Sequence, residues 1–303
     1  MTKPRHSDCV VNWSFVLRLS SFLVLSFTVL SVLFVSSAYG TEVLHPVPGI
    51  TCSIETRQEP PMRLFVAEVD LTDPHIHIRV APGGPDPDGP GKWQTTLMQP
   101  TKIATREHFD LVVNGDFFAA RGLKDAEGTN SKFTSEIWAL VEGPAVTDGA
   151  AWSSCNSNRP CLVVHKDKKV DIEMLVHAEA DDWEVLAGNV MLVKNGLPVP
   201  HRGRTRNPRT AVGVDSKGEK LVILVVDGRK PGVSVGMSYT EMTAEMLRLG
   251  CRDALNLDGG GSSVMAVRDP ATSKMRILNT PSDGHERAVA NTLGISVDSA
   301  PNR

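Results

Sequence analysis

The segment RTAVGVDSKGEKLVILVVDGR, residues 209–229, decides the fold class of this chain. Its two apolar runs, Thr210–Val214 and Leu221–Val226, are rich in valine, leucine and isoleucine, which favours β-strands. The polar stretch between them, Asp215–Gly218, has the composition of a turn. The segment therefore predicts two consecutive strands with a short connection.

Short strand-like runs of the same kind recur along most of the chain. They lie at residues 64–70, 75–80, 111–113, 137–141, 161–165, 170–176 and 190–193. Residues 93–108 predict a helix interrupted near Pro100, and a second helix begins at Ser238, which has capping-box spacing to Glu241, and ends at Gly250. Many short strands with few helices predict an α+β fold, a single domain whose mixed, mainly antiparallel sheet carries a few packed helices.

The composition is that of an ordinary globular protein. The chain has 303 residues, of which 41% are hydrophobic and 22% charged, and its formal net charge is -3. This balance excludes a disordered or collagen-like chain and gives no electrostatic basis for binding a nucleic-acid backbone. We therefore expect no nucleic-acid partner, and the sequence leaves the oligomeric state open.

The amino-terminal segment has the pattern of a secretory signal. Lys3, Arg5 and Arg18 precede an apolar run at residues 19–35, and the small residues Ala38 and Gly40 stand two apart. This order predicts a signal peptide at residues 1–40 and a mature domain at residues 41–303. A retained membrane anchor is the alternative, because the apolar run is long. After cleavage we expect a secreted, periplasmic or cell-envelope protein with no stable membrane partner.

The cysteines agree with export, since the predicted mature chain has an even set of four: Cys52, Cys155, Cys161 and Cys251. The short polar loop from Cys155 to Cys161 favours a disulfide between these two residues. Cys52 and Cys251 are then either bridged to each other or separately free. No Cys/His spacing typical of a zinc site is present.

A glycine triplet follows an acidic residue in the run LNLDGGGSS, residues 255–263. Glycines allow positive φ angles and let a ligand approach the backbone, whose amide groups can bind an anion. Asp258 would act on whatever Gly259, Gly260 and Gly261 hold, with Ser262 beside them. The alternative is a simple turn in which Asp258 only shapes the backbone.

Two further polar clusters follow predicted strands, and they are Asn114 with Asp116 and Asp227 with Arg229. Polar groups just past strand ends often form sites, although N-G and D-G are also common turn dipeptides. Two more arginines are candidate anion ligands because guanidinium groups bind anions in a bidentate manner. These are Arg209 and Arg287.

Other motifs argue against several kinds of chemistry. The glycine-rich run lacks the Lys-Ser/Thr pair of a P-loop, and Ser262 does not lie in G-x-S-x-G. We predict no cofactor and no metal site, and we interpret His75 and His77 as surface or packing residues. Calcium or magnesium would suit the carboxylates of Asp116, Asp227 and Asp258, but no EF-hand-like spacing supports such an ion.

Taken in order, these motifs resemble the phosphodiester glycosidase family over most of residues 60–297. The matching blocks are NGDFF at 114–118, NPRTAVGVD at 207–215, VVDGR at 225–229, SVGMSYTEM at 234–242, LNLDGGGSS at 255–263 and RAVANTLGI at 287–295. The resemblance implies a secreted or lumenal α+β hydrolase that cleaves a sugar-1-phosphodiester, with an N-acetylglucosamine-like sugar, to free sugar and phosphomonoester. Asp116 departs from the glycine that one branch of the family more often has, which leaves the sugar preference open.

On this reading Asp258 is the essential carboxylate and acts as base or nucleophile at the anomeric carbon. Glu241 or Asp227 would be the second carboxylate, although Glu241 is first of all a helix cap. A distance of about 5 Å between the two carboxyl groups would imply retention of configuration, whereas a distance of about 6.5 to 9.5 Å would imply inversion. The glycine amides and Ser262 would bind the phosphate or the sugar. The phosphate would also be bound by Arg209, Arg229 and Arg287. The sugar hydroxyls would be bound by Asn114, Asp116 and Asn256.

Two alternatives remain. One is a hydrolase of another phosphodiester, such as one in a cell-wall or exopolysaccharide polymer. The other is a non-catalytic carbohydrate-binding or exopolysaccharide-related protein of the cell envelope, which would keep a sugar cleft without needing these carboxylates and arginines together.

Overall fold

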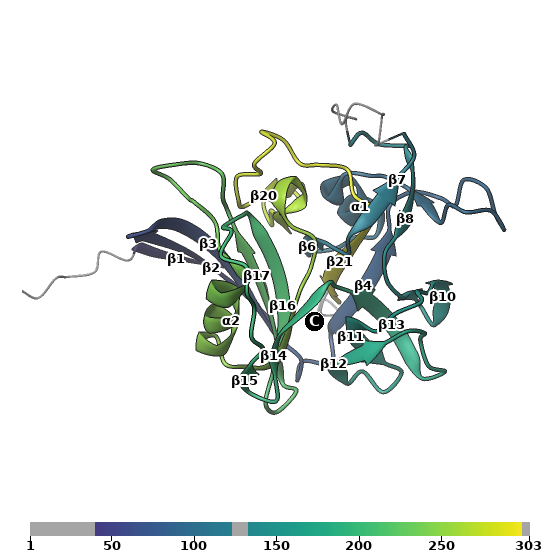
Figure 1. Ribbon diagram of the computed structural model, residues 1–303, viewed down its shortest axis with the longest axis horizontal. Coiled ribbons are helices and arrows are strands. Elements are labelled where there is room, and N and C mark those ends of the chain that lie inside the picture. The colour runs from purple at the N-terminus through teal and green to yellow at the C-terminus, as the bar shows by residue number, and fades with distance from the viewer. Residues whose placement is uncertain (1–39, 123–132, 299–303) are drawn as a thin grey trace, which may run out of the picture. The chain divides into compact units, whose positions relative to one another are not determined.

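Four antiparallel sheets make up most of the protein in its computed structural model (Figure 1), which describes residues 40–122 and 133–298. These residues belong to one compact unit of the chain. The predicted signal peptide lies outside the described residues apart from Gly40, where the first strand begins. No helix in the described part of the chain is long and apolar enough to cross a membrane.

The largest sheet has eight strands in the order β1-β2-β3-β17-β16-β18-β14-β15. Its strands are β1 Gly40–Val47, β2 Ile50–Gln58, β3 Pro61–Asp70, β17 Lys220–Val226, β16 Arg209–Asp215, β18 Cys251–Asn256, β14 Val190–Lys194 and β15 Leu197–Pro198. The predicted strand pair at 209–229 therefore forms the antiparallel hairpin β16–β17 at the centre of this sheet.

Three smaller sheets complete the strand structure. The first has the order β10-β9-β13-β11-β12, with β10 Ala150–Ser153, β9 Ala145–Thr147, β13 Asp182–Ala187, β11 Arg159–His165 and β12 Val170–Leu175. The second has the order β20-β19-β6-β21-β4, with β20 Met275–Ile277, β19 Met265–Arg268, β6 Leu111–Asn114, β21 Asn291–Val297 and β4 Ile76–Pro82. The third has the order β5-β8-β7, with β5 Thr95–Thr96, β8 Trp138–Val141 and β7 Phe118–Ala120.

Within residues 40–122 and 133–298 the helices are α1, Pro100–Arg106, α2, Tyr239–Arg248, and the short 3-10 helix η1, Gly260–Ser262. The predicted helix at 93–108 is shorter than expected because Pro100 is the first helical residue, and the residues before it include β5. Every strand pairing among the described residues is antiparallel. The antiparallel prediction is thus confirmed, whereas the α+β label is only partly correct, since the fold is predominantly β.

One apolar core lies between the larger sheets. Along β17, Leu221, Ile223 and Val225 face this core, while the alternate residues Val222 and Leu224 face the opposite side of the sheet. The same core receives side chains from β6 and β21 of the second five-stranded sheet and from β11 and β13 of the first. A strand buried on both faces reads as a continuous apolar run, which explains the sequence of β17.

The two α-helices cover outer faces of the sheets. α2 packs Met242 and Met246 on the second face of the eight-stranded sheet, where Figure 1 shows it beside β14 and β17. α1 packs Ile103 and Ala104 on Val112 and Ala266 of the sheet that contains β6. The stripe at 242 and 246 is therefore core packing, as an amphipathic helix requires.

The predicted disulfide between Cys155 and Cys161 is absent, because all four cysteines of the described residues are free thiols. Cys161 points into a buried cluster on β11, whereas the Cys155 thiol donates to the Ser157 carbonyl. Cys52 and Cys251 lie on β2 and β18, four strand positions apart, or about 19 Å at the usual strand spacing. That separation excludes a bridge between them.

A close contact between β21 and the loop after α1 gives a test of the packing. A Cβ added at Gly294 would lie 2.0 Å from the Phe109 ring, and Phe109 is fully buried. We expect Gly294→Ala to lower the free energy of unfolding by about 1–3 kcal/mol, as overpacking does in a close-packed core. Urea unfolding would measure it. Gly203→Ala is the control, because a Cβ there meets no atom within 4 Å, and equal stability of the two variants would contradict this packing.

Candidate active site

The strand register brings the predicted polar motifs to one end of the eight-stranded sheet. Arg209, the first residue of β16, pairs with Val226, the last of β17, and Ala211 pairs with Asn256, the last of β18. The residues that follow β17 and β18 are therefore neighbours of Arg209. Asp227, Arg229 and the glycine run meet here although they are far apart in sequence.

Hydrogen bonds hold the glycine run against β6 of a different sheet. The Asp258 amide donates to the Gly115 carbonyl at 3.0 Å, and the Asn114 side-chain amide donates to the Asp258 carbonyl at 2.8 Å. The Gly260 amide donates to the Pro208 carbonyl at 2.9 Å. The sequence N-G-D at 114–116 is thus an anchor for the glycine run and not a hairpin turn.

Two glycines of the triplet lie against an arginine guanidinium, whereas Gly259 lies against the preceding loop. A Cβ at Gly259 would lie 2.9 Å from the Pro208 carbonyl oxygen and 3.8 Å from Cα and Cδ of Arg209. A Cβ at Gly260 would lie 3.0 Å from a terminal nitrogen of Arg229, and one at Gly261 would overlap Nη2 of Arg287 and the Asp283 carboxylate. Gly260 also has a φ angle of +62°, which disfavours other residues. The absence of side chains at Gly260 and Gly261 lets the guanidinium groups of Arg229 and Arg287 approach the backbone.

Two of these arginines have no carboxylate partner within the described part of the chain. Arg209 donates from Nε to the Met237 carbonyl at 3.0 Å and lies over the Tyr239 ring, 4.1 Å from its centroid. Arg229 is exposed and donates weakly to the Asn207 side chain, at 3.3 and 3.4 Å. Their charges are therefore available to an anion.

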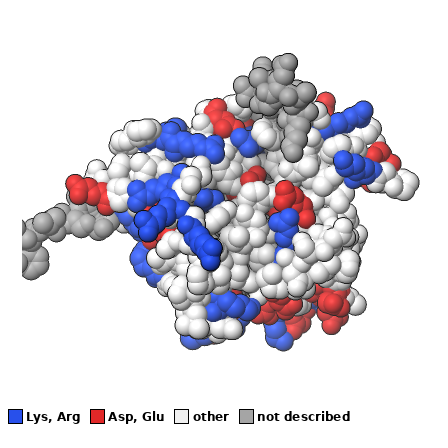
Figure 2. All heavy atoms as spheres, in the orientation of Figure 1, with Lys and Arg blue, Asp and Glu red and all other residues white. Residues whose placement is uncertain are grey.

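Arg287 is held more firmly than the other two. It forms an ion pair with Asp283 at 2.7 Å, lies over the Phe133 ring at 4.0 Å and reaches the Ser262 hydroxyl at 3.5 Å. Figure 2 shows further Lys and Arg side chains gathered over β3 and β17 on the face that it displays. The exposed residues Arg202, Arg204 and Arg206 precede Arg209 in the loop before β16.

Asp258 is the carboxylate on which the charge of Arg287 acts. It is half-buried, and its Oδ1 accepts the Gly259 amide at 2.7 Å. Burial raises the pKa of Asp258 to about 6, although hydrogen bonds from Ser262 and Gly259 and the charge of Arg287 oppose this rise. Asp258 is consequently ionised at neutral pH and takes up a proton in mildly acidic solution.

Asp116 is buried, and its pKa is raised more than that of Asp258. Burial raises the pKa of Asp116 to about 8, against the opposing effects of the Gly143 and Phe117 amides and of Arg159. Both of its oxygens accept backbone amides, at 2.7 Å from Phe117 and 2.8 Å from Gly143. With 2% of its surface exposed, Asp116 supports the loop at 143 and is not open to a sugar hydroxyl.

The two asparagines that the sequence assigns to sugar binding are structural. Asn114 is fully buried, and its oxygen accepts the Thr210 hydroxyl at 2.8 Å and the Val264 amide at 3.2 Å. Asn256 is also fully buried and donates to Asn189 at 2.9 Å. Burial leaves neither side chain any surface for a ligand. Both therefore act by positioning the glycine run.

The two proposed partner carboxylates are also engaged by the fold. Asp227 is 2% exposed, and its Oδ1 accepts the Asn279 side chain at 3.2 Å and the Thr280 amide at 2.9 Å. Burial raises the pKa of Asp227, against the hydrogen bonds from these two groups. Its position at the end of β17 supports the loop at 279–280.

Glu241 completes the predicted capping box with Ser238 and also pairs with Arg206. Partial burial alone would raise its pKa, but the hydrogen bonds from Arg206 and Ser238 hold the pKa of Glu241 below its usual range. The cap is therefore the role that the structure gives this carboxylate.

Sequence reasoning missed two residues near Asp258. Glu142, which is exposed and pairs with Arg159 at 3.0 Å, is the charged group that raises the pKa of both Asp258 and Asp116. Asn291 accepts the Asp116 amide at 2.8 Å, and a Cβ at Gly115 would overlap its side chain. Glu142 comes directly after β8, as Asp227 comes directly after β17. This position after a strand could have identified Glu142 as a candidate from the sequence.

The predicted absence of a metal at these carboxylates is not tested by the structure. Among the described residues, the one group of His, Cys, Asp or Glu close enough to share an ion contains none of Asp116, Asp227 and Asp258. His77, one of the two strand histidines, pairs with Asp298 at 2.8 Å. A cavity of about 570 Å³ opens elsewhere, lined among others by Arg79, His165 and Trp183, and it includes none of the arginines above the glycines.

A model of the phosphodiester glycosidase family matches residues 108–296, more than half of the chain. The SPbeta prophage-derived protein YomE of Bacillus subtilis (strain 168) is 37% identical over 141 residues, which are 45% of this chain and 20% of that relative. The chain thus matches only about a fifth of the length of this curated relative.

Solved structures share the fold. The catalytic domain of zebrafish N-acetylglucosamine-1-phosphodiester alpha-N-acetylglucosaminidase, auto-inhibited by its pro-peptide, has a TM-score of 0.59 at 19% identity, covering 85% of this chain and 87% of that one. A protein of Burkholderia pseudomallei K96243 that is described as exported has a TM-score of 0.57 at 16% identity, covering 78% and 74% of the two chains. A protein from Synechocystis has a TM-score of 0.55 at 13% identity, covering 86% and 64%.

Removal of the charges of Arg287 and Glu142 should shift the pKa of Asp258 in opposite directions. Arg287→Ala removes a positive charge that lowers the pKa of Asp258, so this pKa should rise above about 6. Glu142→Gln removes a negative charge that raises it, so the pKa should fall. A ¹³C NMR titration of the Asp258 carboxyl measures both. Glu219→Gln on the exposed β16–β17 turn is the control, and equal pKa values in all three variants would contradict the site geometry.

Proposed function

Since the chain belongs to the phosphodiester glycosidase family, we propose that it hydrolyses the bond between C1 of a sugar and a phosphate oxygen in a glycosyl phosphodiester. The products are the free sugar and a phosphomonoester. The observation that carries this proposal is the set of cations along the glycine run, where Arg229 lies against Gly260 and Arg287 lies against Gly261 and lowers the pKa of Asp258. Arg209 and Arg229 have no ion-pair partner among the described residues. Cations left unpaired beside a reactive carboxylate fit an anionic substrate.

The arginines act on the leaving group. When the bond from C1 to oxygen breaks, the phosphate keeps the bonding electrons and gains negative charge. A phosphomonoester has a second pKa near 6, so it departs without strong protonation. Guanidinium groups that contact this phosphate stabilise the charge as it develops. The amides of Gly259 and Gly260 do not contribute, because they donate to the Asp258 carboxylate and the Pro208 carbonyl. Arg209 contributes most here because burial fixes its side chain and lowers the surrounding dielectric.

Asp258 acts at the anomeric carbon, either as nucleophile or as the base that activates water. The Gly259 amide and the Ser262 hydroxyl orient its carboxylate. We propose Glu142 as the second carboxylate in place of Glu241 and Asp227, because Glu142 is exposed and its charge raises the pKa of Asp258. Glu241 and Asp227 are engaged by the helix cap and by the loop at 279–280. The configuration of the released sugar distinguishes the two roles of Asp258.

The similarity to known proteins supports the finer parts of this proposal. The zebrafish enzyme is named as an N-acetylglucosamine-1-phosphodiester alpha-N-acetylglucosaminidase, and we propose an N-acetylglucosamine-like sugar for this protein. The Burkholderia neighbour is described as exported, which agrees with our proposal that residues 1–40 direct secretion or export to the periplasm or cell envelope.

Release of free sugar and phosphomonoester from a panel of α-linked sugar-1-phosphodiesters tests the proposed reaction. We expect Asp258→Asn to lose at least about 10²-fold in kcat, because the carboxylate no longer accepts a proton or attacks C1. Arg209→Ala should lose about 10²–10³-fold, as when one charge-stabilising donor is removed. Chelator should leave the wild-type rate unchanged.

Asp269→Asn and Arg248→Ala are matched controls, since both residues are partly or fully exposed and outside the site. Full activity of Asp258→Asn would overturn the proposed mechanism. Sugar binding without release of product from any member of the panel would instead favour the carbohydrate-binding alternative.

The pH profile of kcat/KM provides a separate prediction. Asp258 must be ionised to act, so activity should fall as the pH drops through about 6, the pKa that burial gives this carboxyl. Glu142→Gln should move this acidic limb to lower pH, because the pKa of Asp258 falls when the negative charge is removed. An acidic limb that stays in place in Glu142→Gln would show that a group other than Asp258 controls it.

A further inference from the structure

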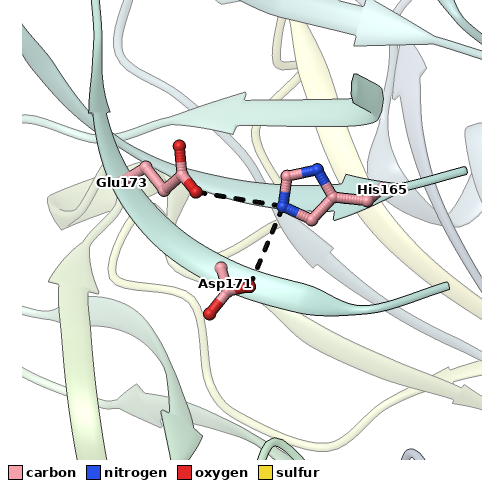
Figure 3. Close-up of side chains that lie close together, drawn as sticks. All are labelled: His165, Asp171 and Glu173. Carbon is pink, nitrogen blue, oxygen red and sulfur yellow. Dashed lines mark ion pairs between the residues drawn. The ribbon is translucent and has the colours of Figure 1, made fainter. Parts of the chain in front are cut away.

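A histidine and two carboxylates converge on the β11–β12 hairpin, outside the candidate active site (Figure 3). His165 ends β11, and Asp171 and Glu173 lie two residues apart on β12, so both side chains project from the same face. One ligand atom from each residue lies within 4.8 Å of the other two. Figure 3 shows both carboxylates directed at Nε2 of His165.

A third carboxylate faces the other nitrogen of the histidine ring. Nδ1 of His165 lies 3.3 Å from Oδ1 of Asp182, which is 4% exposed. The other oxygen of Asp182 accepts the Glu179 amide at 2.7 Å, so Asp182 cannot turn freely. A carboxylate that accepts the proton of one ring nitrogen directs the lone pair of the other nitrogen outward, as it does behind metal-binding histidines.

The distances between these groups fit an ion better than hydrogen bonds. Nε2 of His165 lies 3.8 Å from Asp171 Oδ2 and 3.9 Å from Glu173 Oε1, and both distances are too long for a hydrogen bond. A metal bonded at about 2.1 Å to a nitrogen and an oxygen holds these two atoms about 3–4 Å apart. Only small side-chain movements are therefore needed to bind a common ion.

The charge balance also favours a cation. Three carboxylates surround one imidazole. The positive groups beside them are Arg252, which pairs with Asp171 Oδ1 at 3.2 Å, and Lys169, which pairs with Asp167 and also interacts with the charge of Asp171. The contact from Arg252 uses the oxygen of Asp171 that does not face His165. Glu173 has no cationic partner other than His165 among the described residues.

We propose that His165, Asp171 and Glu173 bind one first-row divalent cation, with Zn²⁺ as the representative ion. An imidazole nitrogen with two carboxylate oxygens is a donor set that zinc accepts, whereas calcium and magnesium prefer oxygen alone. The ligands are 23%, 38% and 45% exposed, which leaves room for water at the remaining position. Asp182 is a positioning residue that holds the ring of His165.

The cation joins β11 to β12 and has no part in the proposed hydrolysis. Arg159, at the other end of β11, lies beside Asp116 and Glu142. Arg159 and His165 are the two ends of β11 and lie six residue steps apart, a distance of about 20 Å at 3.3 Å per step. The bound ion should therefore raise the thermal stability of the protein without changing its catalytic activity.

Titration of the chelator-treated and dialysed protein with Zn²⁺, followed by calorimetry and metal analysis, tests this site. We expect one Zn²⁺ per chain and a higher Tm. Glu173→Gln, an isosteric change at a partly exposed position, and His165→Gln should abolish this binding. Asp182→Asn should weaken it by about tenfold or more, as loss of an orienting partner does.

His77→Gln is the matched control, because the exposed His77 pairs with a single carboxylate, Asp298. It should bind Zn²⁺ as the wild type does. Failure of the wild type to bind Zn²⁺, unchanged binding in both His165→Gln and Glu173→Gln, or displacement of Zn²⁺ by Ca²⁺ or Mg²⁺ at similar concentration would each overturn the proposal. None of these results depends on the glycosidase activity.

Discussion

The buried side chain of Asn114 is the link on which the candidate site depends. Its amide group joins the end of β6 to Thr210 of β16, to the Asp258 carbonyl and to the Val264 amide, so three segments meet at one residue. A buried hydrogen bond contributes about 0.5–1.5 kcal/mol, but an unpaired buried group costs about 1–3 kcal/mol. Replacement of Asn114 would therefore leave the Thr210 hydroxyl, the Asp258 carbonyl and the Val264 amide without this partner, and only backbone bonds such as that from the Asp258 amide to Gly115 would remain.

The charge state of Asp258 follows from competition between burial and its neighbours. Burial favours the neutral acid, and the amide of Gly259, the hydroxyl of Ser262 and the charge of Arg287 favour the carboxylate. Because Glu142 opposes Arg287, the balance gives a pKa of about 6. The group is thus ionised at neutral pH yet less strongly solvated than a surface aspartate, which suits a base or nucleophile.

The strands could be predicted from the sequence because burial of one face requires alternating apolar residues and burial of both faces requires a continuous apolar run, as in β17. The α+β label was only partly correct, because the helix predicted at 93–108 begins at Pro100 and has only 7 residues, Pro100–Arg106. Site roles were harder, since Asn114 and Asn256 look like surface polar residues until tertiary burial is known. Glu142 was missed because its proximity to Asp258 arises only from the packing of separate sheets.

The three arginines also show why the site fits an anion better than a neutral sugar alone. Like charges gathered over one loop repel each other, and Asp283 compensates only that of Arg287. A fold selected for stability alone would pair Arg209 and Arg229 as it pairs Arg206 with Glu241 and Arg248 with Glu245. The carbonyl contacts of Arg209 orient its guanidinium without neutralising it. In the proposed reaction, the phosphate of the substrate would relieve this repulsion and supply a counter-charge.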